Sequence, residues 1–157
     1  MSAAESLAAE YLKGAADLRA AVTGMTREQL VARPVAGRMS TLEVVCHLSD
    51  FESVFADRMK RIIALGDSPL LVAADDKLFT KELRYHDRDA EEELALVAAT
   101  RGQMARIIRK LSPEQFQQTG VHTVAGLMSL EKVIRGAINH FAHHIPFIAD
   151  KRKALGV

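Results

Sequence analysis

Apolar residues recur along four long segments of the chain at the three- and four-residue spacing of amphipathic helices. In chain order, the predicted helices cover residues 3–23, 40 or 41 to about 65, 89 to about 111, and 129 to beyond 148. Shorter helical turns are expected at residues 26–31 and after Ser112. The pattern therefore predicts an all-α chain.

Capping residues and breakers support these boundaries. Glu43 follows Ser40 at the spacing of a capping box, and Gly66 and Pro69 close the second helix. Pro146 falls inside the fourth helix, where it removes a backbone hydrogen bond, so we expect a kink there.

Four such helices are typical of a four-helix bundle, which we expect to form one domain over residues 1–157. The connection at residues 66–88 carries only a weak pattern. An antiparallel neighbour needs only a few residues of loop, whereas this connection is long enough to run the length of the bundle. It therefore favours a crossover between parallel second and third helices.

Composition narrows the cellular setting and the partners. The chain has 157 residues, 48% of them apolar, and a formal net charge of +1, which gives no reason to expect nucleic acid or an anionic membrane. Cys46 is the single cysteine, so an intrachain disulfide is excluded. With neither a signal peptide nor a membrane span in the pattern, we expect a cytoplasmic location.

His140 and His144 are the strongest chemical signal in the sequence. They lie four residues apart on the predicted fourth helix, which places both rings on one face, one turn apart. That face is otherwise strongly apolar, and an imidazole left there without a partner costs about 1–3 kcal/mol. A metal ion would satisfy both rings, although buried carboxylates would as well.

His47 lies on the apolar face of the second helix and by itself reads as an ordinary core histidine. Together with His140 and His144, it forms a set of three nitrogen ligands that leaves a coordination position open, as in many catalytic zinc sites. Imidazole also suits nickel, iron and copper, so the set predicts a divalent metal without identifying it.

Other polar residues are weaker candidates. His143 points about 100° around the helix from His144, and His86 and His122 lie in predicted connections. Glu43 and Asp50 lie one turn either side of His47. They are expected to be solvated helix charges, with a role as acceptors for a ring N–H as the alternative.

Three further side chains are assigned structural roles. Cys46 is expected to be a small core residue. Arg58 and Arg61 are expected to form surface salt bridges, with anion binding as the alternative.

With these motifs in place, the sequence resembles the DinB-like (DinB/YfiT) family. The resemblance rests on the segment Ser40–Glu52, which contains His47-Leu48, and on Gly126–Leu130 leading to the His-x-x-x-His of His140 and His144. It covers nearly the whole chain. The family's tryptophan before the second helix is replaced by Arg38-Met39, which leaves the shape of the substrate pocket open.

The resemblance implies an up-down-down-up bundle, a divalent metal (Zn, Ni or Fe) held by His47, His140 and His144, and a homodimer. It also implies an activity that uses a low-molecular-weight thiol and a small electrophile, as a transferase or isomerase. Metal coordination lowers the pKa of a thiol or of water, so hydrolysis is the other reaction such a site supports.

Two alternatives stay open beside a metal-dependent enzyme. A non-catalytic metal-binding or stress-response dimer module is favoured by the absence of an evident acid–base pair. A plain helical bundle with core histidines is the third interpretation, and it predicts unaltered metal content and little loss of metal-linked stability in His→Ala variants.

Overall fold

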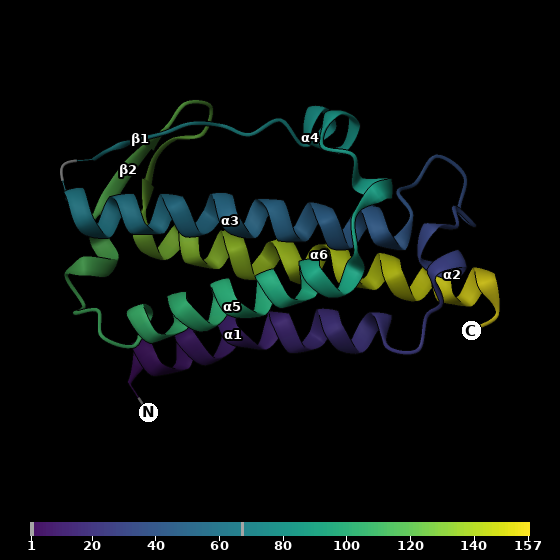
Figure 1. Cartoon of the computed structure of the whole chain (residues 1–157). Coiled ribbons are helices and arrows are strands. Elements are labelled where there is room, and N and C mark those ends of the chain that lie inside the picture. Colours follow the sequence, from purple (N-terminus) through teal and green to yellow (C-terminus); the bar gives the residue numbers. More distant parts are fainter. Residues whose placement is uncertain (1, 67) are drawn as a thin grey trace.

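Four long helices dominate the computed structural model, which describes residues 2–66 and 68–157 (Figure 1). They are α1 (Ala3–Val22), α3 (Thr41–Leu65), α5 (Ala90–Ile108) and α6 (Leu130–Leu155). The predicted helices are present, and most of their ends lie within about two residues of the prediction. The third ends at Ile108 instead of Leu111, because Lys110 and Leu111 donate to carbonyls three residues back and so form a tighter turn.

The helices begin where their capping residues stand. Ser40 and Glu43 form the predicted capping box: the Glu43 N–H donates to Ser40 Oγ at 3.1 Å, and the Ser40 N–H donates to Glu43 Oε2 at 2.7 Å. Asp89 accepts from two backbone N–H groups at the start of α5, and Ser129 accepts from one at the start of α6. Pro146 lies inside α6, and the kink expected there stays a prediction.

Contacts near the helix ends show the direction in which each helix runs. Arg19, near the end of α1, pairs with Glu91 at the start of α5 at 2.8 Å, so these helices are antiparallel. Arg88, just before α5, pairs with Asp50 in the first half of α3 at 2.8 Å, so α3 and α5 run the same way. In Figure 1, α6 runs in the direction of α1, opposite to α3 and α5.

The connections hold more structure than the all-α prediction allowed. The segment between α3 and α5 contains β1 (Leu70–Leu71), α4 (Asp76–Glu82) and a 3₁₀ turn, η1 (Tyr85–Asp87). Elsewhere lie α2 (Arg27–Val31), which was predicted, the 3₁₀ turn η2 (Gln115–Gln117), and the strands β2 (Thr119–His122) and β3 (Gly126–Ser129). The purely helical prediction was therefore incomplete, because strands of two to four residues are too short to show a period in the sequence.

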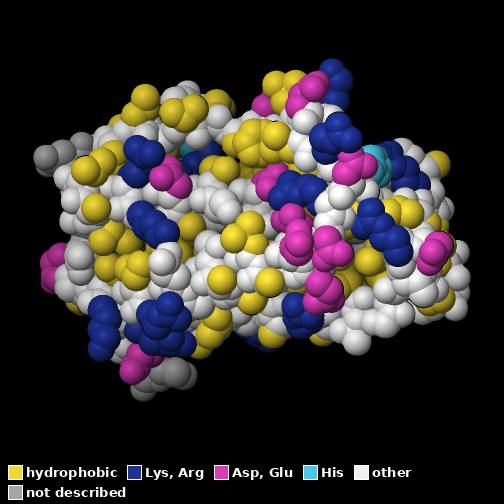
Figure 2. Space-filling model, in the orientation of Figure 1, with side chains coloured by type: hydrophobic (Ala, Val, Ile, Leu, Met, Phe, Trp, Pro, Cys, Tyr) yellow, Lys and Arg dark blue, Asp and Glu magenta, His cyan; other side chains and the backbone are white. Residues whose placement is uncertain are grey.

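The three strands form a small sheet packed beside α3. β1 pairs parallel with β2, and β2 pairs antiparallel with β3. On the inner face Leu71 is buried and packs with Ile62 against Gly120, where a side chain would collide with Leu71. On the outer face apolar side chains gather over β1 and β2 (Figure 2).

Between the helices the core is apolar, and the ion pair Arg101–Glu52, at 2.8 Å, is fully buried within it. Leu18, Met59, Met104 and Phe141 are among its large buried side chains. Within residues 2–66 and 68–157, none of the helices is long and apolar enough to cross a membrane.

Candidate metal centre

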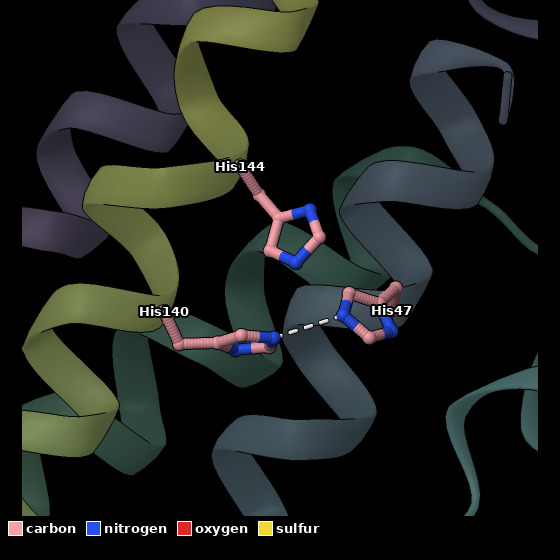
Figure 3. A group of neighbouring side chains, drawn as sticks. All are labelled: His47, His140 and His144. Atoms are coloured by element: carbon pink, nitrogen blue, oxygen red, sulfur yellow. Dashed lines mark hydrogen bonds between the residues drawn. The ribbon is translucent and has the colours of Figure 1, made fainter.

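Three histidine rings meet between α3 and α6. His47 comes from α3, and His140 and His144 come from successive turns of α6, with all three rings turned toward one another (Figure 3). One ring nitrogen from each lies within 4.8 Å of the others, and the Nε2 atoms of His47 and His140 are 2.8 Å apart. The structure thus brings together the three residues that the sequence singled out.

Helix packing places these rings. His47 lies between the buried Val44 and Leu48 on the inward face of α3, and its own side chain is buried. The ring of Phe51, one turn later, packs at a tilt against His47, with ring centroids 4.7 Å apart, and against His140 at 5.6 Å. Aromatic rings therefore form one wall of the cluster and limit the access of water to it.

Burial keeps these imidazoles neutral. Burial, with the neighbouring His47 as the next cause, lowers the pKa of His140 to about 3 and that of His144 to about 4. Burial also lowers the pKa of His47. Since a histidine binds a metal through the lone pair of its neutral form, all three nitrogens are ready to act as ligands near pH 7.

The donor set fits a divalent metal ion. Zinc–nitrogen bonds of about 2.0–2.1 Å in a tetrahedral site place ligand nitrogens roughly 3.3 Å apart. The observed separations, 2.8 Å for His47–His140 and within 4.8 Å for the set, bracket that value. Small side-chain shifts would therefore suffice to form the site.

Glu43 and Asp50 are neither the solvated helix charges that the sequence favoured nor acceptors for the histidine rings, because both are largely buried and paired with other residues. Glu43 caps α3 and pairs with Arg33 and His86, while Asp50 accepts two hydrogen bonds from Arg88 at 2.8 and 2.9 Å. Both carboxylates face the segment between α3 and α5, which contains His86 and Arg88. The sequence did not predict where this segment packs. In the described part of the chain the Nδ1 atoms of the three clustered histidines have no hydrogen-bond partner.

The remaining histidines lie outside the cluster. His143 is exposed, with its ring centroid 4.9 Å from that of His144. His86 is exposed on η1 and pairs with Glu43 at 3.0 Å. His122 lies in β2, and its Nδ1 accepts two backbone N–H groups of the following turn. All three thus lie where the sequence placed them, outside the core.

The other residues weighed from sequence have structural contacts. Cys46 is buried as predicted, and burial raises the pKa of its thiol to about 12. Arg61 pairs with Asp57 at 2.7 Å, as predicted for a surface salt bridge. Arg58 instead donates to the carbonyl of Val72 at 2.9 Å.

The sequence missed the contribution of α4. Phe79 of α4 lies 5.6 Å from Phe51, ring centroid to centroid, so this helix packs close to the cluster. The negative charge of Asp76, also on α4, acts against burial by raising the pKa of both His47 and His144. The only local signal was the helix cap formed by Asp75, which accepts from the Leu78 N–H at 2.9 Å.

Comparisons with known proteins place this arrangement in a wider group. A family model described as the DinB superfamily matches residues 10–148. A protein from Oceanobacillus iheyensis, named as a candidate metal-dependent hydrolase, is 28% identical over 138 residues, covering 87% of this chain and 79% of that protein. YfiT from Bacillus subtilis, named in the same way, is 26% identical over 142 residues, covering 90% and 79%.

A solved structure of Bacillus subtilis YfiT has the same fold. It superposes with a TM-score of 0.90 at 24% identity, over 99% of this chain and 90% of the other. That work describes YfiT as a candidate metal-dependent hydrolase with an unusual four-helix bundle topology.

Proposed function

The chain belongs to the DinB superfamily, and on that premise we propose that it is a divalent-metal-dependent enzyme whose metal is held by His47, His140 and His144. The observation that carries the proposal is the convergence of three neutral histidine rings from two helices, that of His47 buried and those of His140 and His144 half-buried. The names of the relatives, which describe metal-dependent hydrolases, support hydrolysis as the reaction.

The chain's own residues supply the frame for this chemistry. A divalent ion on three histidines retains an open coordination position and acts there as a Lewis acid. Phe51 and Phe55 pack against His140 at 5.6 and 5.9 Å between ring centroids and shield the ring from water. Transfer to a low-molecular-weight thiol, which the family resemblance implies, is the other reaction to be tested. Zinc, nickel and iron all suit the ligand set.

Elemental analysis of the purified protein tests the metal site. We expect about one equivalent of divalent metal per chain, lost in His140→Ala/His144→Ala and retained in His143→Ala, the matched control one residue away. Chelation should lower the melting temperature of the parent protein by several degrees and leave that of the double variant unchanged. Equal metal content in the parent and the double variant, even after supplementation, would refute the site.

A non-catalytic metal-binding module is the second candidate. It is favoured because Glu43 and Asp50 are both engaged by other residues, so neither serves as a proton acceptor beside the histidines. Assays of the metal-loaded protein for ester and amide hydrolysis and for thiol transfer separate the candidates. Turnover that disappears with the metal would exclude the non-catalytic module.

A further inference from the structure

A cavity of about 460 Å³ opens beside the histidine cluster, at the end of α6. His144 lines it, together with Met39 and Phe147 and the charged residues Arg38, Asp150 and Lys151. Its volume lies within the roughly 300–1,000 Å³ that is typical of small-molecule sites. A ligand in this cavity would therefore have one of the three candidate metal ligands within reach.

One of the charged side chains lining the cavity, Lys151, has hydrogen-bond donors that are mostly unused. Lys151 is only 3% exposed, and its Nζ donates to the carbonyl of Phe147, one turn earlier in α6, at 3.0 Å. Among the described residues no carboxylate lies within ion-pair distance of that ammonium, which has three donors in all. A buried ammonium held by one neutral acceptor is stabilised when an anion supplies the remaining acceptors.

The charges around the cavity favour a small anion with one negative charge. Arg38 is exposed at the rim and makes no ion pair in the part of the chain that the structure describes. Asp150 is the only carboxylate among the lining residues, so Arg38 and Lys151 together leave a net charge of +1. Glu43, whose charge also acts on Lys151, is already paired with Arg33 and His86.

We propose that this cavity binds the carboxylate of a small organic acid, with Lys151 and Arg38 as the carboxylate-binding residues, while the acid's reactive end reaches the histidine cluster. This inference rests on the proposed function and names the substrate class. Lys151 follows His144 by seven residues on α6, two turns or about 10.5 Å along the axis, and its side chain folds back toward Phe147. The carboxylate must therefore lie several bonds from the reacting atom.

A pair of thiols that differ only at the far end tests the proposal. The cobalt-loaded protein is titrated with 4-mercaptobutyrate and with 4-mercapto-1-butanol, and the sulfur-to-cobalt charge-transfer absorption gives the dissociation constant of each. We expect the acid to bind about tenfold or more tightly than the alcohol, because a charge-assisted hydrogen bond contributes on the order of 1.5–3 kcal/mol.

Variants assign the preference to the cavity. Lys151→Met keeps the buried aliphatic stem and removes the charge, and it should reduce the acid-over-alcohol ratio to near one. Arg38→Gln, on the exposed rim, should reduce the ratio in part and gives a test even where Lys151→Met fails to fold. Lys153→Met makes the same substitution on the same helix, at an exposed residue outside the cavity, and should leave the ratio unchanged.

The possible failures are distinguishable. Equal binding of the two thiols to the parent protein, or an acid preference that survives both Lys151→Met and Arg38→Gln, would overturn the carboxylate site and leave the metal site standing. A cobalt-loaded protein that gives no charge-transfer band with either thiol would overturn the claim that a ligand joins the cavity to the cluster. A protein that takes up no cobalt would refute the proposed function, and this inference with it.

Discussion

At the residue scale, the three clustered histidines are unusual because the Nδ1 atom of each is buried without a hydrogen-bond partner among the described residues. The Nε2 atoms of His47 and His140 face each other at 2.8 Å. An unsatisfied buried polar group costs about 1–3 kcal/mol. Such an arrangement opposes folding unless a ligand binds it, which is the physical basis of the metal proposal.

The depressed histidine pKa values predict that the metal-free protein loses stability in mild acid. In the folded chain the pKa is about 3 for His140 and about 4 for His144, below the unfolded value of about 6.5. At pH values between the folded and the unfolded pKa, the unfolded chain binds more protons than the folded chain. The free energy of unfolding therefore falls as the pH drops below about 6.5.

Urea denaturation in the presence of a chelator measures this loss. From pH 7.5 to pH 5 we expect a decrease of up to about 4 kcal/mol from these two residues together, about 2 kcal/mol from each. His140→Leu/His144→Leu removes both groups and should show a shallower pH dependence. Parallel stability curves for the parent and this variant would contradict the assignment.

At the element scale, one buried guanidinium joins all four long helices. Arg101 of α5 donates to Glu52 of α3 at 2.8 Å, to the Tyr11 carbonyl of α1 at 2.5 Å and to the Ala137 carbonyl of α6 at 2.9 Å. Glu52 also accepts from the Tyr11 hydroxyl. Because His47 and His140 lie close to these anchor points on α3 and α6, the network helps to set the spacing of the histidines.

Removing one partner of this ion pair should cost far more than removing both. Arg101→Met leaves Glu52 buried without its cation, and we expect the free energy of unfolding to fall by about 3–5 kcal/mol. Arg101→Met/Glu52→Met removes both charges, so it should recover much of that loss.

A double-mutant cycle measures this coupling: the parent protein, Arg101→Met, Glu52→Met and the double variant are each unfolded by denaturant titration. Lys13→Met, which breaks an exposed pair with Asp17, is the matched surface control and should cost less than about 1 kcal/mol. Additive effects of Arg101→Met and Glu52→Met would show that the pair is not coupled.

At the scale of the whole molecule, the small sheet presents an apolar row to the outside. Leu70, Val121 and Leu127 stand opposite one another across the three strands and are 61%, 38% and 64% exposed. Directly paired residues share one face of a sheet. Their neighbours Val72 and Val124 are 68% and 82% exposed, so the row belongs to a larger apolar surface.

We propose this surface as the contact face of the homodimer that the family resemblance implies. Sedimentation velocity should then give a species of twice the 17.2 kDa chain mass. Leu70→Asp/Leu127→Asp should give the single-chain mass with little loss of stability, since both side chains are largely exposed. Leu96→Asp, at an exposed leucine on α5, is the control and should leave the dimer intact. A parent protein that sediments at the single-chain mass at micromolar concentration would refute the dimer.

The sequence by itself determined the four long helices and the membership of the histidine set. Helical periodicity and capping depend on residues three or four apart. The capping box of Ser40 and Glu43 and the shared helix face of His140 and His144 can therefore be predicted from a short stretch of sequence. His47 was included because it shares an apolar helical face, a property that can also be read from a short window.

Only the tertiary structure decided which distant groups meet. In the folded chain Glu43 pairs with Arg33 and Asp50 pairs with Arg88, and neither carboxylate hydrogen-bonds to the clustered histidines. Helix α4 also packs close to the cluster. The tertiary structure also pairs three very short strands and gathers Arg38 and Lys151 around one cavity beside His144. These contacts join residues far apart in the chain, and their geometry depends on how whole helices pack, which no local spacing encodes.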